Sequence, residues 1–358
     1  MDRPTIEIYE AQAGEYEARR PARHAARAGA FAAAVLPGLP CVDLGCGPGV
    51  YLEALGGASS VVGLDAAYAM VDRARRRAAE TVVVQGDLEA LPFRNGALGG
   101  AWARNTYVHV PKAHLPLALA HLHRALALDA PLEITALVGD DEGHLIDDEF
   151  PGRFFARWSP DRFAEVVTGA GFTVERVEVV NDAAWVRARR ARTLPDFVGP
   201  AMRLLVCGLN PSLVAADAGY GYAGATNRFW PAALAAGVVS RARDPFHALT
   251  VDGVGMTDLV KRATSRADLL RTSEYAAGVE RVRRLVEWLR PGGVVFVGLA
   301  GWRAAVDRQA RPGMQPGGFA GVPAYVMPST SGLNARTTLP DLVAHLRQAA
   351  AMSGPRPS

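Results

Sequence analysis

The sequence predicts two α/β domains in tandem. Its 358 residues are too many for one typical α/β domain and enough for two, each with its own hydrophobic core. Short apolar segments of strand length alternate with longer helical segments, and this alternation starts again near residue 201. Such alternation predicts largely parallel, doubly wound sheets. We therefore expect a first domain over residues 1–182, a linker over 183–200 and a second domain over 201–350.

The expected elements follow the chain in order. Residues 1–36 should be mainly helical, and the strands of the first domain should be Cys41–Leu44, Val61–Leu64, Val82–Val84, Gly100–Ala103, Leu132–Leu137 and Thr173–Val180. Between residues 181 and 200 the chain becomes rich in Arg and Ala and then contains Pro and Gly, which suits a connector. The second domain should contain strands at Arg203–Cys207, Gly293–Val297 and Ala324–Val326, and helices at Arg228–Ala236, Tyr275–Leu289, Gly301–Ala310 and Leu339–Ala350.

Composition excludes several classes of protein. With 49% hydrophobic and 21% charged residues, the chain is typical of soluble globular proteins, and no run approaches the roughly 18 apolar residues of a membrane span. The charged N-terminus lacks the apolar stretch of a secretory signal, so we expect a cytoplasmic protein with no membrane partner. Three cysteines allow neither a disulfide framework nor a four-cysteine iron–sulfur cluster, and the eight histidines lack metal-ligand spacing, so we predict no metal.

Charge is distributed unevenly along the chain. Residues 1–190 contain 20 Lys and Arg against 25 Asp and Glu, whereas residues 191–358 contain 19 against 11. A basic C-terminal half favours an anionic partner such as DNA, because phosphate contacts supply most of the non-specific affinity for nucleic acid. The alternative is a general preference for Arg, which makes up 37 of the 39 basic residues.

The first candidate site consists of turns that follow successive strands of the first domain. Residues 42–49 read Val-Asp-Leu-Gly-Cys-Gly-Pro-Gly, where glycines let the backbone approach a ligand that a Cβ would exclude. Asp65 ends the next strand, where its carboxylate can accept hydrogen bonds from ribose hydroxyls, and Asp87 follows the strand after that. These residues predict an adenosine-binding cleft. A dinucleotide-binding fold is the rival interpretation, but its glycines have a different spacing.

The glycine-rich turn resembles the first motif of class I S-adenosylmethionine-dependent methyltransferases, and residues 86–93 resemble the segment after their third strand. The resemblance extends over residues 7–180 and implies a Rossmann-like sheet with S-adenosylmethionine as cofactor. It implies cofactor-binding roles for Asp43, Gly45, Gly47, Gly49, Asp65 and Asp87, with Tyr16 or Arg20 closing over the cofactor. Residues 104–109 are candidates for the acceptor pocket. His109 is a candidate base, although a lone His on a helix is more often structural. The sequence does not identify the methyl acceptor.

The second candidate site is assembled from three separate motifs. Residues 208–212, Gly-Leu-Asn-Pro-Ser, directly follow a strand, and the proline holds Asn210 rigid at the strand end. Residues 218–223 form a loop with two tyrosines, and Thr-Asn-Arg-Phe-Trp follows at 226–230. Residues 326–334 read Val-Met-Pro-Ser-Thr-Ser-Gly-Leu-Asn, again at the end of a strand. All three motifs meet at one edge if the sheet is parallel.

These motifs resemble the mismatch-specific uracil-DNA glycosylase and thymine-DNA glycosylase family over residues 203–347. The resemblance implies a three-layer α/β/α fold that acts, without a cofactor, on double-stranded DNA with a mismatched or damaged pyrimidine. Asn210 would orient the attacking water, and the flipped base would stack on Tyr222 or, less readily, on Tyr220. Substrate and DNA contacts are expected from Leu209, Ser212, Tyr220, Tyr222, Asn227, Ser331, Gly332, Leu333, Asn334 and Arg336, with Leu333 as the wedge that replaces the extruded base.

Two departures from the glycosylase pattern concern specificity. Ser212 stands where a Gly is common and adds a hydroxyl at the floor of the base pocket, and Arg336 offers its charge one place later than in some relatives.

Lys261 is the only lysine of the second domain and is distant from both motifs, which argues against a Schiff-base lyase step.

Three interpretations of function remain open. The first is a bifunctional protein whose glycosylase removes uracil, with thymine and ethenocytosine as further candidates, and whose methyltransferase has an unknown acceptor. In the second, methylation of a small molecule or nucleic acid is the main activity and the C-terminal domain only binds DNA. In the third, the first domain is vestigial or structural.

Overall fold

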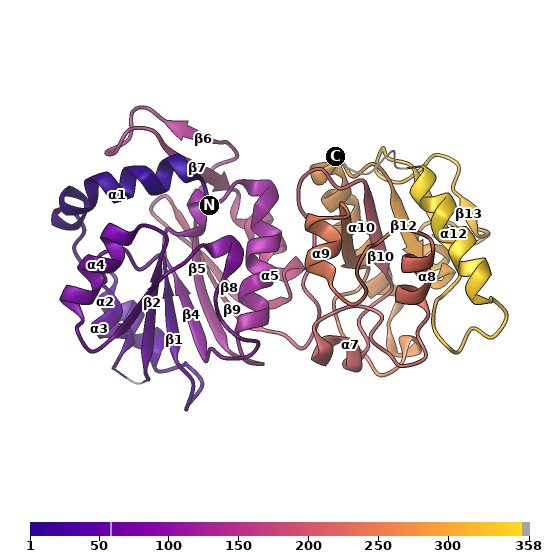
Figure 1. Ribbon diagram of the computed structural model, residues 1–358, viewed down its shortest axis with the longest axis horizontal. Helices are drawn as coiled ribbons and strands as arrows, with labels where there is room; N and C mark the ends of the chain where they lie inside the picture. Colours follow the sequence, from indigo (N-terminus) through magenta and orange to yellow (C-terminus); the bar gives the residue numbers. More distant parts are fainter. Residues whose placement is uncertain (58, 353–358) are drawn as a thin grey trace. The chain divides into compact units, whose positions relative to one another are not determined.

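The chain forms two compact units, each built around its own sheet (Figure 1). The computed structural model describes residues 1–57 and 59–352. The first unit is Met1–Ala191, and the second begins at Arg192. The predicted fold class, two α/β sheets in one chain, is confirmed. No helix within the described ranges is both long and apolar enough to cross a membrane.

The first sheet has a parallel centre and an antiparallel edge. Strands β3, β2, β1, β4 and β5 are parallel neighbours in that order, β9 pairs antiparallel with β5, and β8 pairs antiparallel with β9. The hairpin of β6 and β7 joins the carboxyl end of β5. The strands are β1 (Cys41–Leu44), β2 (Val61–Asp65), β3 (Val82–Gln85), β4 (Gly100–Ala103), β5 (Pro131–Val138), β6 (Glu142–Leu145), β7 (Arg153–Trp158), β8 (Phe172–Val180) and β9 (Ala183–Arg190).

Helices cover the first sheet because its central strands are buried on both faces; β1 and β4 contain no exposed residue. Helices α3 and α4 pack on β1 to β3, α6 packs on β5 and β8, and α1 lies across the carboxyl ends of the strands (Figure 1). The helices are α1 (Arg3–Ala18), α2 (Ala25–Ala32), α3 (Leu52–Leu55), α4 (Tyr68–Arg77), α5 (Leu115–Ala125) and α6 (Pro160–Gly169), with single turns η1 (Leu88–Ala90), η2 (Tyr107–His109) and η3 (Lys112–His114).

The expected linker is the main error in the predicted organisation. Residues 183–190 form strand β9, in which Ala184, Trp185 and Val186 are buried and buried Ala188 lies between Arg187 and Arg189. Arg187 donates to the buried carboxylate of Glu133 on β5 at 2.8 Å. The negative charge of Glu133 on the neighbouring strand thus compensates the positive charge of Arg187 in β9. Residues 192–200 of the expected linker belong to the second unit, where residues 194–198 are buried.

The second sheet is smaller and has the order β11-β10-β12-β14-β13. The first four strands are parallel, and β13 is antiparallel to β14. Helix α8 packs on α12, and α10 packs on α11. The strands are β10 (Leu204–Gly208), β11 (Val254–Asp258), β12 (Val294–Val297), β13 (Gly313–Met314) and β14 (Ala324–Met327); the helices are α7 (Leu213–Ala218), α8 (Phe229–Ala235), α9 (Pro245–Thr250), α10 (Thr272–Leu289), α11 (Leu299–Ala305) and α12 (Leu339–Ala351), with the turn η4 (Ala267–Leu269).

Parallel pairing of β10, β12 and β14 brings two of the predicted motifs to one edge of this sheet. Residues 208–212 leave the carboxyl end of β10, and residues 328–334 leave the carboxyl end of β14. The third strand end at this edge, that of β11, places Asp258 in register with Gly208.

Candidate functional sites

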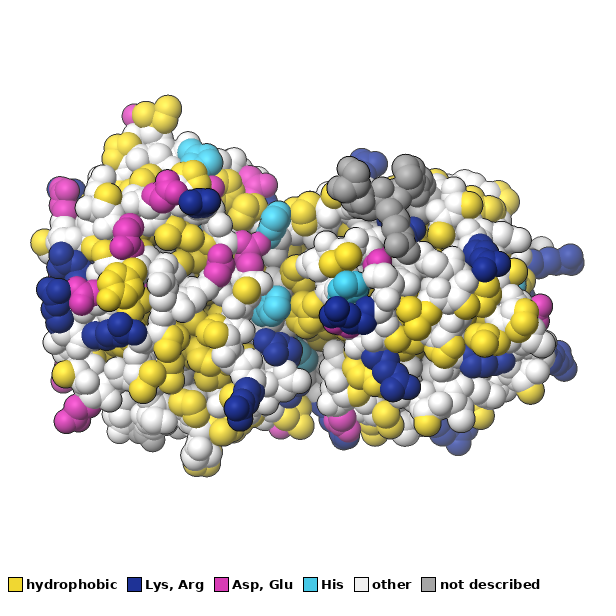
Figure 2. Space-filling view, viewed as in Figure 1, with side chains coloured by type: hydrophobic (Ala, Val, Ile, Leu, Met, Phe, Trp, Pro, Cys, Tyr) yellow, Lys and Arg dark blue, Asp and Glu magenta, His cyan; other side chains and the backbone are white. Residues whose placement is uncertain are grey.

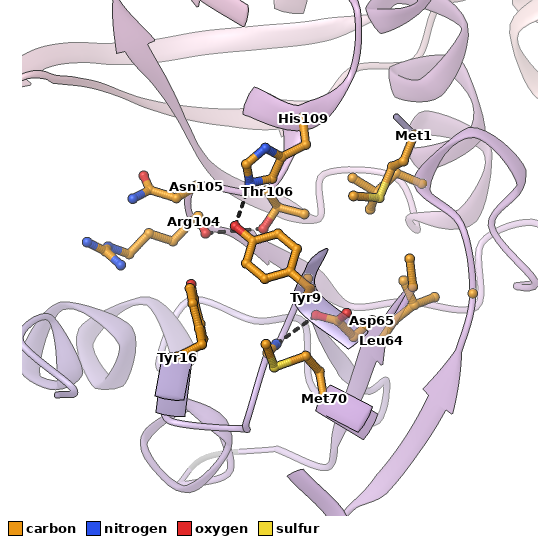
Figure 3. Close-up of a pocket in the computed structure, with 15 residues that line it drawn as sticks. Met1, Tyr9, Tyr16, Leu64, Asp65, Met70, Arg104, Asn105, Thr106 and His109 are labelled. Atoms are coloured by element: carbon orange, nitrogen blue, oxygen red, sulfur yellow. Dashed lines mark hydrogen bonds between the residues drawn. The ribbon is translucent and has the colours of Figure 1, made fainter. Parts of the chain in front are cut away.

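A cavity in the first unit lies at the carboxyl ends of β1, β2 and β4, beneath α1 (Figure 3). The predicted residues that line it are Tyr16, Gly45, Gly47 and Asp65, together with residues 104–106 and His109. Tyr9 and Met1 also line it, although the sequence did not single them out.

The glycines of the first motif have different roles. Gly45 and Gly47 line the cavity in left-handed conformations, with φ of 63° and 53°. A Cβ on Gly45 would lie 2.3 Å from the Cγ2 atom of Thr106, so the turn needs glycine in order to pack on Thr106. Gly49 does not line this cavity; its Cα faces Ala74 of α4, where a Cβ would come within 3.1 Å. We therefore assign Gly49 to packing rather than to ligand contact.

Asp65 is fixed by the turn that it faces. Its Oδ2 accepts the backbone N–H of Gly47 at 2.8 Å, and its Oδ1 accepts that of Ala67 at 3.0 Å. Burial raises the pKa of Asp65 to about 6, against the opposing effect of these hydrogen bonds. Each oxygen keeps a second lone pair, so the carboxylate can still accept a ribose hydroxyl.

The other two predicted carboxylates are not among the residues that line the cavity. Asp43 is buried beneath the turn, its Oδ2 has no hydrogen-bond partner among the described residues, and burial raises its pKa well above the usual range. Asp87 accepts the N-terminal amino group of Met1 at 3.1 and 3.2 Å and the N–H of Glu89 at 2.9 Å. The carboxylate of Asp87 thus binds the N-terminal amino group, and its cofactor-binding role stays a prediction from the family resemblance.

Tyr9 and His109 form a hydrogen-bonded pair in the cavity wall (Figure 3). The Nδ1 of His109 lies 2.6 Å from the carbonyl oxygen of Phe154, which can only accept, so Nδ1 carries the proton. The Nε2 of His109 therefore accepts the hydroxyl proton of Tyr9 at 2.8 Å, while Arg153 donates to the same hydroxyl oxygen at 2.8 Å. Burial lowers the pKa of His109 to about 4, which keeps the ring neutral and able to accept.

A cavity in the second unit brings the second set of motifs together. Its lining includes Leu209, Asn210, Ser212, Tyr222, Asn227, Ser331 and Gly332. Tyr220 is not among the lining residues; its ring meets that of Trp230 at 6.5 Å, so Tyr222 remains the candidate for stacking. Ser212 caps α7, accepting the N–H of Ala215 at 3.1 Å, and its hydroxyl proton remains available to a ligand.

The amide of Asn210 has one orientation that its neighbours allow. Its Nδ2 donates to the carbonyl oxygens of Pro211 at 3.1 Å and Arg262 at 3.0 Å, and to the hydroxyl of Thr264 at 2.8 Å. Because carbonyl oxygens only accept, the nitrogen must face them. The Oδ1 atom has no hydrogen-bond partner among the described residues and is the atom that a water can use.

Asp258 is a cavity residue that the sequence argument missed. Its Oδ1 lies so close to Gly208 that a Cβ there would come within 2.3 Å, which explains the glycine before the Leu-Asn-Pro motif. The hydroxyl of Tyr222 is buried beside it without a partner among the described residues, and the Tyr222 ring stacks on Phe229 at 4.0 Å. Burial raises the pKa of Asp258 to about 6. The feature that could have identified Asp258 as a site residue is its position at the end of a parallel strand.

Two family models match separate parts of the chain. Residues 41–129 match the family model described as Methyltransferase domain, and residues 195–351 match that of the Uracil DNA glycosylase superfamily. This chain joins a methyltransferase domain to a uracil DNA glycosylase superfamily domain.

Three solved structures are similar to the methyltransferase domain. The DhpI–SAH complex is 22% identical, covers 53% of this chain and 99% of its own, and has a TM-score of 0.43. A SAM-dependent methyltransferase from Aquifex aeolicus is 19% identical, with 53% and 100% covered and a TM-score of 0.39. An S-adenosylmethionine-dependent methyltransferase from Mesorhizobium loti is 21% identical, with 45% and 96% covered and a TM-score of 0.37.

The loop of residues 329–337 in the glycosylase-superfamily domain presents Leu333 to solvent. Its side chain is 97% exposed and so can contact a partner. Asn334 is used inside the loop, since its Nδ2 donates to the carbonyl of Ser329 at 2.9 Å and to the hydroxyl of Thr337 at 3.0 Å. Arg336 is exposed. Gly332 packs on Thr226, where a Cβ would come within 2.4 Å.

Arg228 holds this loop in place. Its guanidinium donates to the carbonyl oxygens of Ser331 at 3.1 Å and Asn334 at 2.7 Å, and to that of Thr337. The sequence showed this arginine only as part of a motif.

Within residues 1–57 and 59–352, no group of three His, Cys, Asp or Glu side chains could hold a metal ion.

Replacing Arg228 by Gln should loosen the loop without unfolding the domain. Hydrogen bonds to a charged donor contribute about 1.5–3 kcal/mol each, so amide exchange of residues 331–337 should accelerate at least tenfold, as measured by hydrogen–deuterium exchange. Arg347→Gln is the matched control, because Arg347 donates to the carbonyl of Ala235 at the surface, away from this loop. Unchanged exchange in Arg228→Gln would contradict the anchoring role.

Proposed function

We propose that the C-terminal domain is a monofunctional DNA glycosylase that removes uracil from mismatches with guanine, in base excision repair. The observation that carries this proposal is the amide of Asn210, whose nitrogen is saturated by three acceptors and whose oxygen is left free at the cavity. This fixed acceptor suits a water that attacks C1′ of the sugar. Since an amide is a weak base, the rate depends mainly on positioning, and slow turnover is expected.

The surrounding residues suit an everted base. Tyr222 supplies an aromatic face in the cavity that contains Asn210, and exposed Leu333 can fill the gap left in the duplex. The basic charge of the C-terminal half supports binding to the DNA backbone, and on the face shown in Figure 2 acidic side chains are sparser over this unit than over the first. We retain thymine and ethenocytosine as further substrates, because Ser212 alters the pocket floor.

The arrangement of Lys261 supports hydrolysis without a Schiff base. Its ammonium group donates to Asp196 at 2.9 Å, and Arg281 donates to the other oxygen of the same carboxylate at 2.6 Å. Lys261 thus belongs to a structural ion-pair network and does not line the cavity of Asn210. The proposed reaction therefore ends with an abasic site.

We also propose that the methyltransferase domain binds S-adenosylmethionine, which when bound supplies an activated methyl group. The residues present fit this cofactor: Gly45 and Gly47 expose backbone without a Cβ, and Asp65 offers lone pairs to ribose. Tyr16 closes the cavity from α1, where Arg20 lies over its ring at 4.5 Å.

Asn210→Ala should lower uracil release from a G·U duplex by about 10²–10³-fold, because the water loses its acceptor. A single-turnover assay on the full chain measures this. Asn95→Ala is the matched control, since Asn95 is in the first unit and its side chain contacts Arg124. Equal release by wild type and Asn210→Ala would refute the assignment and favour a domain that only binds DNA.

Excision should accelerate as the pH falls through about 6, the pKa of Asp258. The folded-state pKa is raised, so below it the carboxyl group is neutral and can donate to the base, whereas above it the carboxylate repels a base that leaves as an anion. Asp258→Asn should remove this dependence and match the low-pH rate at pH 7.5. Single-turnover rates between pH 5 and 8 test this; a profile that is the same in both proteins would contradict it.

Asp65→Ala should weaken binding of S-adenosylmethionine at least tenfold, because the ribose loses its acceptor and the Gly47 turn loses its anchor. Titration calorimetry on the full chain measures this effect. Asp72→Ala is the control, because Asp72 forms a surface pair with Arg76. Wild-type affinity in Asp65→Ala would remove the ribose contact from the proposal.

A further inference from the structure

A second cavity adjoins the cofactor cavity of the methyltransferase domain. The two share Tyr9, Tyr16, Arg104, Asn105 and His109 in their walls. The remaining wall comes from the segment that follows α1, the end of β5 and the β6–β7 hairpin. A molecule in the second cavity would therefore face the cofactor cavity across these shared side chains.

The wall of this second cavity is rich in arginine. It contains five arginines and two carboxylates. Arg153 is neutralised by Asp148, to which it donates at 2.6 and 2.8 Å. Arg19 and Arg20 both contact Glu149. These three arginines are therefore held by the protein's own carboxylates.

Arg23 and Arg104 have no carboxylate partner among the described residues, and both line the cavity. Arg104 directly follows β4, and its Nε atom is buried without any hydrogen-bond partner among the described residues. A guanidinium without a carboxylate partner is the donor group that suits carboxylates and phosphates best, because its N–H groups match their geometry. Aromatic rings of Tyr9, Tyr16 and Phe155 provide apolar surface beside these charges.

We propose that this second cavity is the methyl-acceptor site and that the acceptor is a small organic acid, bound through its carboxylate or phosphate group by Arg104 and Arg23. The proposal rests on the proposed S-adenosylmethionine binding. A nucleic-acid acceptor is less well supported, because residues 1–190 carry more acidic than basic side chains and the basic charge is local. Tyr9 and His109, in the shared wall, adjoin both sites.

The test uses benzoate and phenyl phosphate as anionic probes and benzamide as their neutral counterpart. Each is titrated calorimetrically into the full chain, with and without saturating S-adenosylhomocysteine. At least one acid should bind at least tenfold more tightly than benzamide, and the stronger acid identifies the acidic group. Arg23→Gln and Arg104→Gln should each weaken the binding of that acid at least tenfold. Arg157→Gln, which removes a surface ion pair with Asp141, should leave its binding unchanged.

Three results would overturn the proposal. In the first, benzamide binds as tightly as both acids; in the second, both arginine variants keep wild-type affinity for the acids. In the third, a single-stranded RNA oligonucleotide binds more tightly than phenyl phosphate, and its binding depends on Arg23. Arg23 is exposed, so its replacement leaves folding intact if Arg104→Gln does not fold. Failure of S-adenosylhomocysteine to bind would instead refute the cofactor proposal, because the acids are also titrated without it.

Discussion

Parallel strand pairing is the constraint on which both sites depend. In the second sheet it places Gly208 opposite Asp258, and the motif that contains Asn210 leaves the same edge. In the first sheet, the pairing of β1 with β2 brings the Gly45–Gly47 turn beside Asp65, whose carboxylate then accepts a backbone N–H from that turn. Reactive groups that are distant in sequence are thus positioned by the backbone hydrogen bonds of the strands.

Incompletely satisfied polar groups are associated with these sites. Buried atoms of Asp43, Arg104 and Tyr222 lack partners within the described ranges, although burial of an unpaired polar group opposes folding. Arg104 and Tyr222 line cavities, and Asp43 lies beneath the turn of the first motif. Arg104 and Tyr222 are therefore positioned beside any ligand in their cavities, whereas Asp43 supports the turn from below.

The two domains meet anionic ligands in different ways. The first unit has more acidic than basic side chains overall, and Arg23 and Arg104 in the wall of its second cavity suit one small acid. The second half of the chain has an excess of basic residues, which suits a polyanion. Both domains are rich in arginine, but their charge distributions suit different anionic ligands.

The sequence by itself determined the two α/β sheets and the glycine, carboxylate and Asn-Pro motifs at strand ends, because strand periodicity and turn chemistry are local. It did not determine that residues 183–190 form β9, since the carboxylates that pair with its arginines, such as Glu133 on β5 with Arg187, are distant in sequence. The roles of Asp258, Arg228 and the Tyr9–His109 pair were not predicted, although His109 was a candidate base, because each role depends on a partner distant in sequence. Tertiary structure also assigned Gly49 to packing and gave Asp87 to the N-terminus, since only the folded chain shows which atoms each residue meets.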